Sequence, residues 1–287
     1  MKRKSRKVPP NVLSANIEGY VKELAGLTIE AQRSEYFKEY LDAMSCFWEY
    51  SHANQILIRL TMKHATQVAG YRTWIKLGRQ VKKDEHGIWI LAPCHKTTAK
   101  VDKATGEESD MNVRYFISVP VWDVSQTHGK PLPSPDLDVA GNDFLWLRDN
   151  LLQVCSKKNI EVVYQDLGVN GAYGFATKKG IVICSGQEVN TEVNTLIHEL
   201  THMLLHLGKA DKPSKSEREI DAEGVAYVVM KHFGMESKSF NYLALYNPDV
   251  EKIMSRMKTI SDTSREIIKS ISTMDLIENA APLLQSC

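Results

Sequence analysis

Two histidines, His198 and His202, constrain this chain most, because they stand four residues apart in a segment with helical periodicity. Side chains four positions apart share one face of an α-helix, which turns once in 3.6 residues. Both imidazoles can therefore reach one tetrahedral metal ion. Glu199 completes an H-E-x-x-H pattern, and its carboxylate can act as general base on a water molecule that the metal activates. The pattern predicts a site for one Zn²⁺ ion that catalyses hydrolysis.

The residues around the motif favour an amphipathic helix. Apolar side chains recur at three- and four-residue steps between Val193 and Leu207, which is the spacing of one helical face. The two histidines fall roughly opposite this stripe, so the helix can bury one side and line a cleft with the other. Asn190 is a candidate N-cap and Gly208 a candidate end of the helix. A surface helix that matches the motif by chance is the simpler alternative.

A short apolar run at 180–184 precedes this helix and is typical of a β-strand. We expect the strand to lie ahead of the motif helix, where it could hold an extended peptide by edge pairing. Segments 160–164 and 174–176 are predicted to join it in a small sheet. This arrangement would place a bound peptide beside the two histidines.

A catalytic zinc site needs a third protein ligand and an open fourth position. Glu219 and Glu223 lie four residues apart on a second predicted helix, and glutamate zincins take their third ligand from such a helix. We assign Glu219 as the ligand and Glu223 as the carboxylate that orients a ligand histidine. The reverse assignment stays open, and a solvated helix face is the simpler explanation for either glutamate alone. His206, one turn beyond the motif, is expected to be structural or supporting.

Length and charge predict two domains. The chain has 287 residues, more than one typical domain. Residues 1–135 contain 20 Lys and Arg against 14 Asp and Glu, whereas the remainder contains 16 against 21. The first part therefore carries +6 and the second −5, and a basic first half hints at a phosphate-bearing partner. Ordinary variation in surface charge is the alternative.

The expected fold class is α+β, with the two domains joined by a linker. Three prolines within 131–135 favour an extended connection. We predict an N-terminal mixed helix and strand domain, a Pro-rich linker, and a C-terminal metallopeptidase-like domain with a helical extension, over 8–128, 129–141 and 142–287. Helices are expected at 11–25, 30–44, 51–63 and 144–157, strands at 87–92 and 115–122, a polar hairpin loop or excursion at 96–110, and one or two helices at 250–284.

Cysteine usage and hydropathy indicate a cytoplasmic protein. The five cysteines are scattered and never form C-x-x-C, which is typical of reduced thiols rather than a disulfide framework. The basic segment 1–7 is not followed by the apolar run of a secretory signal. No stretch approaches 18 apolar residues, so no membrane span is expected.

Aromatic and basic residues alternate in the first half of the chain, between 51 and 90. Bases stack on aromatic rings while cations follow the phosphates, a combination suited to single-stranded nucleic acid. In the simpler alternative, the aromatic rings belong to the core and the lysines to a solvated rim. The candidate DNA-binding residues are Asn54, Tyr71, Arg72, Trp74, Lys76, Arg79, Lys82 and Lys83.

Several phrases of this half resemble the N-terminal domain of ArdC-type antirestriction proteins. They include S-x-x-N-x-x-L-I from Ser51, V-A-G-Y-R-T-W from Val68 and V-P-V-W-D-V-S-Q-T ending at Thr127. The second half is similar to zincin-like metallopeptidase domains related to ImmA/IrrE endopeptidases, through Gly174-Phe175-Ala176, the H-E-L-T-H-M-L-L-H run and the following E-x-x-A-E helix. The resemblance covers about 12–247, and the polar segment 96–110 departs from it.

The resemblance implies single-stranded DNA binding by the first domain, zinc in the second, and protection of incoming mobile DNA from restriction. Two functions remain open. The chain is either a zinc metalloendopeptidase that cleaves an unidentified protein and binds DNA, or a non-catalytic protein that shields single-stranded DNA while zinc holds its fold. For the peptidase, Tyr227 and Tyr173 are the candidate donors to the reacting carbonyl oxygen. No second-metal carboxylate cluster supports a zinc nuclease.

Overall fold

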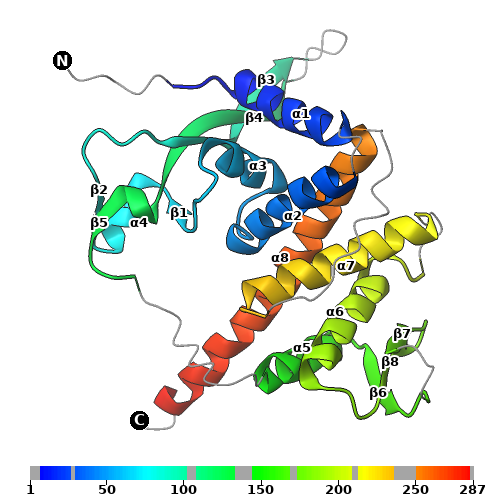
Figure 1. Cartoon of the computed structure of the whole chain (residues 1–287). Coiled ribbons are helices and arrows are strands. Elements are labelled where there is room, and N and C mark those ends of the chain that lie inside the picture. Colours follow the sequence, from blue (N-terminus) through cyan, green and yellow to red (C-terminus); the bar gives the residue numbers. More distant parts are fainter. Residues whose placement is uncertain are drawn as a thin grey trace. The chain divides into compact units, whose positions relative to one another are not determined.

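The computed structural model describes residues 7–26, 30–101, 108–132, 144–168, 173–208, 213–235 and 250–284 (Figure 1). Helices and strands are mixed throughout, which confirms the α+β class. The chain divides into two compact units, residues 1–22 with 53–133 and residues 23–52 with 134–287. The boundary between residues 133 and 134 lies inside the predicted linker, whereas the grouping of 23–52 with the C-terminal half was not indicated by the sequence. None of the described helices has both the length and the apolarity to cross a bilayer.

The first unit holds two small sheets and short helices. One sheet has the strand order β1-β4-β3, and the other pairs β2 with β5. Its buried apolar residues include Ile56, Trp74, Ile88 and Val121. The elements are α1 (Pro10–Gly26, which ends in the second unit), α3 (His52–Thr61), β1 (Val68–Ala69), α4 (Tyr71–Lys76), β2 (Arg79–Val81), β3 (Ile88–Val101), β4 (Glu108–Asp123), the 3₁₀ turn η1 (Val124–Gln126) and β5 (Thr127–Gly129).

Strands β3 and β4 form a long antiparallel hairpin, paired from Ile88 with Val121 to Val101 with Glu108. The expected hairpin in the polar segment 96–110 is therefore present, but most of that segment is paired strand rather than loop. Backbone pairing needs no apolar side chains, so a polar composition did not prevent it. Residues 102–107 lie outside the described residues.

The phrase that ends the first domain forms a tightly hydrogen-bonded turn around Asp123. Its buried carboxylate accepts hydrogen bonds from the backbone N–H groups of Thr66, at 2.8 Å, and Ser125, at 2.9 Å. The Gln126 side chain accepts from the Asp123 N–H at 3.0 Å, which completes a capping box. The residues Asp123, Ser125 and Gln126 of this phrase therefore hold the end of β4 against the loop before β1.

The second unit is built on a three-stranded sheet with helices packed against it (Figure 1). Strand order is β6-β8-β7, with β6 parallel and β7 antiparallel to the central strand β8. Its elements are α2 (Glu30–Cys46), α5 (Leu145–Lys157), β6 (Glu161–Gln165), β7 (Gly174–Ala176), β8 (Gly180–Cys184), α6 (Val189–Leu205), α7 (Lys215–His232) and α8 (Val250–Leu284).

The expected role of the strand at 180–184 was wrong. Both sides of β8 are already paired, with β6 and with β7, so β8 has no free edge for an extended peptide. Ile181 and Ile183 of β8 are fully buried, as expected for the central strand of a covered sheet. The outer strand nearest the motif helix is β7, which packs against α6.

Helix α6 carries the H-E-x-x-H motif as predicted. Its apolar stripe is fully buried at Val193, Leu196, Ile197 and Leu200. The helix begins at Val189 after an N-cap at Glu188 and is capped by His206 at its end. The candidate N-cap Asn190 therefore lies inside the first turn, and Gly208, in the left-handed region with φ +78°, lies beyond the helix end.

Helix α8 is one continuous helix, which resolves the expectation of one or two. It packs against α5 and α7. The Arg265 guanidinium donates to the carbonyl oxygens of Trp48, at 2.7 Å, and of Tyr50. These bonds join the segment after α2 to the C-terminal helix, and they help explain why 23–52 groups with the second unit.

Candidate metal centre

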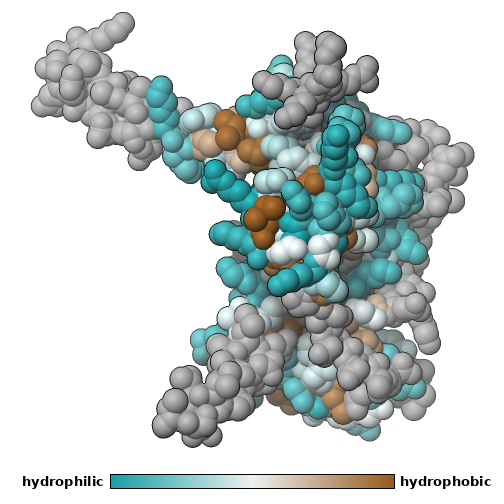
Figure 2. Space-filling view, turned by 90° about the vertical axis from the view of Figure 1, so that its left-hand side faces the viewer, coloured by the Kyte–Doolittle hydropathy of each residue, from teal (hydrophilic) through white to brown (hydrophobic). Residues whose placement is uncertain are grey.

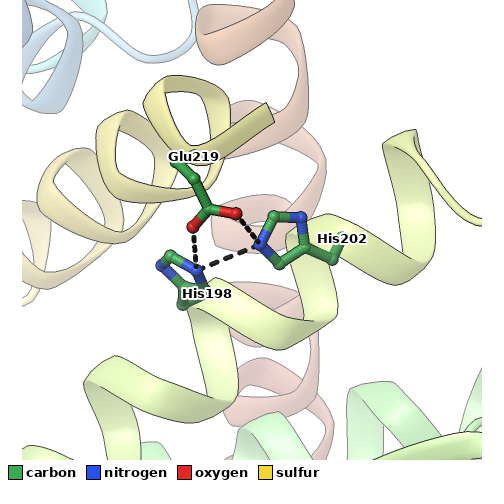
Figure 3. Close-up of side chains that lie close together, drawn as sticks. All are labelled: His198, His202 and Glu219. Atoms are coloured by element: carbon green, nitrogen blue, oxygen red, sulfur yellow. Dashed lines mark hydrogen bonds and ion pairs between the residues drawn. The ribbon is translucent and has the colours of Figure 1, made fainter. Parts of the chain in front are cut away.

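The structure brings His198, His202 and Glu219 together (Figure 3). The two Nε2 atoms lie 3.0 Å apart, and the Glu219 carboxylate oxygens lie 3.3 Å from His198 Nε2 and 3.7 Å from His202 Nε2. Ligand atoms about 2.0–2.1 Å from a tetrahedral zinc ion lie roughly 3.3 Å from one another. The spacing of the three donors therefore fits one small divalent ion, and their chemistry, two imidazoles and a carboxylate, fits zinc.

Two packed helices position these donors. Helix α6 presents both histidines from adjacent turns, and α7 packs against it and presents Glu219. The start of α7 is fixed by a capping box, in which Ser214 Oγ accepts from the Glu217 N–H and Glu217 Oε2 accepts from the Ser214 N–H. The capping box fixes where the first turn of α7 begins, and this determines the helix face on which Glu219 lies.

Glu223 lies one turn further along α7 and approaches the other nitrogen of His198. Its Oε1 atom is 3.4 Å from His198 Nδ1. The two glutamates thus face different nitrogens of one ring, Glu219 beside Nε2 and Glu223 beside Nδ1. A carboxylate at Nδ1 fixes the orientation of an imidazole whose Nε2 faces a metal, which is the arrangement assigned to these two residues from the sequence.

A chain of buried polar groups supports His202. His202 Nδ1 contacts His206 Nδ1 at 3.0 Å, and His206 Nε2 contacts Asp221 Oδ2 at 3.1 Å. Arg256 of α8 donates to the same carboxylate oxygen at 2.7 Å. His206 and Asp221 are only 2% and 1% exposed. The supporting role expected for His206 agrees with this geometry, whereas Asp221 and Arg256 were missed because no local spacing links them to the motif.

Glu199 lies beside the donors and is 8% exposed. Burial raises the pKa of Glu199, although the positive charge of His198 and a hydrogen bond from the Ala176 backbone act in the opposite direction. A carboxylate with a raised pKa is a better proton acceptor near neutral pH. The contact with Ala176 also places Glu199 at the β7 side of the site.

The two histidines differ in their electrostatic surroundings. Burial lowers the pKa of His202 to about 4, and the charges of His198, His206 and Arg218 add to this effect. Burial also lowers the pKa of His198, but the hydrogen bond and charge of Glu223, with the charges of Glu199 and Glu219, outweigh it and leave the pKa raised. His202 is therefore neutral at pH 7, the form in which an imidazole binds a metal.

The donors open into a cavity of about 480 Å³. Phe175 and Ala176 of β7 form part of its lining, and Leu207 adds an apolar contact after α6. Two cations of α7, Lys215 and Arg218, also line it. The cavity is large enough for one or two side chains of a peptide, by comparison with ligand pockets of about 300–1,000 Å³.

One candidate donor to the reacting carbonyl was wrong. The Tyr227 side chain is buried, and its hydroxyl donates to Asp42 Oδ1 at 2.7 Å. This hydroxyl is committed to a contact between α7 and α2, and Tyr227 does not line the cavity. Tyr173, which directly precedes β7, is 67% exposed, and its role stays a prediction.

Two candidate DNA-binding residues were also wrong. Trp74 is 2% exposed, and its indole N–H donates to the Trp122 carbonyl at 2.9 Å, so no face is open for a base. Asn54 is buried, and its side chain both donates to the Leu91 carbonyl and accepts from the Leu91 N–H, each at 2.9 Å. The first is a core residue, and the second fixes α3 to the edge of β3.

Two basic candidates make contacts within the first unit. Arg79 donates to Thr127 Oγ1 at 2.8 Å, and Lys82 donates to the Ser125 carbonyl at 2.7 Å. These bonds hold β2 to the segment around β5. The remaining candidates, Tyr71, Arg72, Lys76 and Lys83, are exposed.

The exposed candidates contribute to a mixed apolar and basic surface formed by α4 and its C-cap residue Leu77. Tyr71, Ile75 and Leu77 are each more than 40% exposed, and Arg72 and Lys76 lie among them in the chain. Figure 2 looks onto the side that carries α4, β2 and β5 and shows hydrophobic side chains set among hydrophilic ones. The Tyr71 ring meets Trp122 edge-on at 6.1 Å between centroids, which leaves part of the ring open to solvent.

Comparisons with known protein families match the two halves of the chain to two different domains. Residues 28–122 match the family described as the N-terminal domain of anti-restriction factor ArdC, and residues 155–261 match the IrrE N-terminal-like domain of peptidase family M78. The chain has the ArdC-type two-domain architecture. Its second unit therefore carries a metallopeptidase-like domain. The first match begins inside 23–52, the segment that groups with the second unit.

The chain is also similar to individual proteins. An uncharacterized protein of Bacillus anthracis, pXO2-81, is 24% identical over 295 residues, which cover 88% of this chain and 50% of that protein. The chain thus spans about half the length of this relative. The crystal structure of metal-free antirestriction protein ArdC from plasmid R388 has 21% identity and a TM-score of 0.48, with 81% of this chain and 86% of that chain covered. The Mn(II)-bound structure has 16% identity and a TM-score of 0.45, with 78% and 84% covered.

Proposed function

We propose that this chain is an antirestriction protein of the ArdC type whose second unit is a zinc-dependent endopeptidase and whose first unit binds single-stranded DNA. The observation that carries the peptidase is the convergence of His198, His202 and Glu219, with Glu199 buried beside them on the wall of a cavity. Three protein donors leave one position of a tetrahedral ion open, as catalytic sites require.

The protein groups have distinct parts in this reaction. A divalent ion held by His198, His202 and Glu219 would lower the pKa of a water molecule and polarise the peptide carbonyl. Glu199 would accept the proton of the attacking water and deliver it to the leaving amine, because its carboxylate is buried and next to the donors. Glu223 would hold the ring of His198 through Nδ1, and His206 would hold that of His202.

The decisive experiment is the substitution Glu199→Gln. We expect the variant to bind zinc in a 1:1 ratio, measured by elemental analysis, and to lose cleavage of a bacterial peptide library read by mass spectrometry. His202→Ala is the matched variant, and it should lose both zinc and cleavage because it removes a donor. Continued cleavage by the Glu199→Gln protein would rule out Glu199 as the general base.

A non-catalytic function is the second candidate, and the exposed surface of α4 favours it. Tyr71 offers an aromatic ring, and Arg72 and Lys76 offer charges for phosphates. Such a protein would coat single-stranded DNA and exclude nucleases, with zinc holding the fold. A restriction-protection assay separates the two functions, because full protection by the Glu199→Gln protein favours coating and lost protection favours proteolysis.

We further propose that the protein acts in the cytoplasm. The four cysteines among the described residues, Cys46, Cys94, Cys155 and Cys184, are all free thiols. Free thiols are typical of reducing compartments, and incoming DNA meets restriction enzymes in the cytoplasm.

A further inference from the structure

The cavity beside the metal donors contains two positive charges that the proposed reaction does not use. Lys215 and Arg218 lie in the first turns of α7 and line the cavity together with His202 and Glu219. Arg218 lines the same cavity wall as His198 and lies one residue before Glu219 on α7, so its side chain stands close to the metal donors. Cations at this place would repel a bound metal ion, and they call for a separate explanation.

The carboxylates that α7 carries near these cations are already engaged. Glu217 closes the capping box with Ser214, and Glu223 faces His198. Asp221 is held by His206 and Arg256, and Glu219 by the two metal-binding histidines. Within the described part of the chain, neither Lys215 nor Arg218 has an ion pair.

The Arg218 guanidinium also contains a buried donor without a partner. Its Nε atom is shielded from solvent and makes no hydrogen bond within the described residues. An unsatisfied buried donor is unfavourable, and a donor on a charged group more so. A rotation of the Arg218 side chain that turns Nε toward a carboxylate in the cavity would remove that cost.

We propose that Arg218, assisted by Lys215, binds a carboxylate of the substrate next to the scissile bond, so that the peptidase selects acidic peptides. The proposal rests on the proposed peptidase function and names its substrate class. The planar guanidinium pairs with a carboxylate through two parallel hydrogen bonds. The carboxylate comes from an Asp or Glu side chain or from a free C-terminus.

The remaining lining favours a peptide over a polynucleotide. Phe175 and Leu207 give the cavity apolar contacts, and the outer strand β7 lies along it. Glu199 and Glu219 line the same cavity, and their negative charges would repel a row of phosphates but accept a peptide with one carboxylate beside the two cations.

Peptide hydroxamates test the proposal without knowledge of the natural substrate, because the hydroxamate group anchors them on the metal. The probes are pairs that differ only in Asp or Asn beside the hydroxamate, on either side, with a blocked C-terminus. Binding to the zinc-loaded full chain is measured by calorimetry. We expect the Asp compound of one pair to bind roughly 10-fold more tightly than its Asn partner, as for a charge-assisted hydrogen bond.

Substitutions of Arg218 test whether this side chain causes the preference for the Asp compound. Arg218→Gln should abolish the Asp preference, and Arg218→Glu should reverse it in favour of a matching Lys compound. Lys231→Gln removes an exposed cation from the last turn of the same helix and should leave the preference intact. A structural role of Arg218, or a role in polarising the carbonyl, would weaken both compounds equally and would not change their ratio.

The outcomes distinguish failure of the acidic-substrate proposal from failure of the proposed peptidase function on which it rests. Equal binding of Asp and Asn compounds by the wild-type protein would overturn the acidic preference and leave the metal centre standing. Failure of both compounds to bind would overturn the metal centre as well. A free C-terminal carboxylate that restores tight binding to an Asn compound would support the proposal and identify the source. If a single-stranded oligonucleotide displaced the Asp compound from the wild-type protein but not from the Arg218→Gln protein, Arg218 would bind phosphate, and the acidic-peptide proposal would be overturned.

Discussion

At the candidate metal centre, the ring of His202 contacts a residue that is not itself a candidate metal donor. The contacts run from His202 through His206 to Asp221, and Arg256 holds the far side of the Asp221 carboxylate. Carboxylates behind a ligand histidine fix the ring and raise its basicity. Because His206 and Asp221 are buried, water cannot replace either side chain.

We therefore predict that Asp221→Asn lowers zinc affinity by roughly 10- to 100-fold, measured by competition with a fluorescent chelator. Arg256→Gln should give a smaller loss, because it removes only the outer partner and leaves the carboxylate in place. The control is Glu266→Gln, which breaks an exposed ion pair with Lys158 and should leave affinity unchanged. Wild-type affinity in a folded Asp221→Asn protein would show that Asp221 does not position His202.

The Asp123 carboxylate makes stability depend on pH in the first unit. Burial alone would raise its pKa, but hydrogen bonds from Ser125, Thr66 and Gln67 outweigh burial and lower the pKa. A carboxylate with a lowered folded-state pKa stabilises the fold above the unfolded value of about 3.9, and this contribution disappears as pH falls through the folded value.

We expect Asp123→Asn to lower the free energy of unfolding by about 1–3 kcal/mol at pH 7, with the deficit shrinking below about pH 4. Urea denaturation followed by tryptophan fluorescence at pH 7 and pH 3 measures this difference. Asp84→Asn is the control, because this exposed turn residue has φ 67°, which Asn adopts as readily as Asp. A deficit that stays constant between the two pH values would contradict the role given to the carboxylate.

The sequence predicted the position of some site residues correctly and of others wrongly. His198, His202, Glu219 and Glu223 meet as expected, because four-residue spacing on a helix determines which side chains share a face. Asp221 was missed, since its partners belong to other helices. Trp74 and Asn54 were misassigned for a related reason. The sequence alone does not distinguish a buried aromatic or amide side chain from an exposed one, because burial depends on tertiary packing.

At the level of elements, periodicity located the helices and strands but not the order of the strands. Helix α6 and strand β8 occur where apolar spacing placed them. The pairing of β8 on both sides depends on β6 and β7, which no pattern within 180–184 records. The long β3–β4 hairpin was only partly predicted, because the polar segment 96–110 lacks the apolar alternation of a half-buried strand.

Strand pairing also explains a required glycine in β8. A Cβ atom on Gly180 would lie 2.2 Å from the carbonyl oxygen of Glu161 in the paired strand β6. The obstacle is backbone, so β6 and β8 would have to separate. Because β8 is the central strand beside α6, any separation of the sheet would also disturb the wall of the metal site.

We predict that Gly180→Ala lowers the free energy of unfolding by about 1–3 kcal/mol, as overpacking does, and weakens zinc binding at the same time. Thermal unfolding and chelator competition measure the two effects. Gly19→Ala gives the opposite sign, because a Cβ there has no neighbour within 4 Å and alanine stabilises a helix interior by about 0.5–1 kcal/mol. A Gly180→Ala protein as stable as the wild type would show that the sheet can yield at this position.

For the whole molecule, the candidate DNA-binding surface and the candidate metal centre belong to different units. The exposed ring and cations of α4 lie in the unit formed mainly by 53–133, and the metal donors lie in the unit that contains 134–287. Residues 1–135 carry a net +6 and the remainder −5. The proposed function accordingly assigns attraction to DNA phosphates to the basic first part of the chain and hydrolysis to the part that holds the metal donors.

We predict that DNA binding and hydrolysis can be removed one at a time. Tyr71→Ala should weaken binding of a fluorescent single-stranded oligonucleotide by roughly 5- to 150-fold, since stacking contributes about 1–3 kcal/mol per base, and should retain zinc and peptide cleavage. Tyr71→Phe keeps the ring and should bind like the wild type, whereas Glu199→Gln should bind DNA normally and cleave nothing. If the affinity of the Tyr71→Ala protein for the oligonucleotide falls steeply as the salt concentration rises, the binding that remains comes from phosphate contacts. If Tyr71→Ala bound the oligonucleotide as tightly as the wild type, α4 would not be the DNA-binding surface, and the exposed strands of the first unit would have to supply the stacking rings instead.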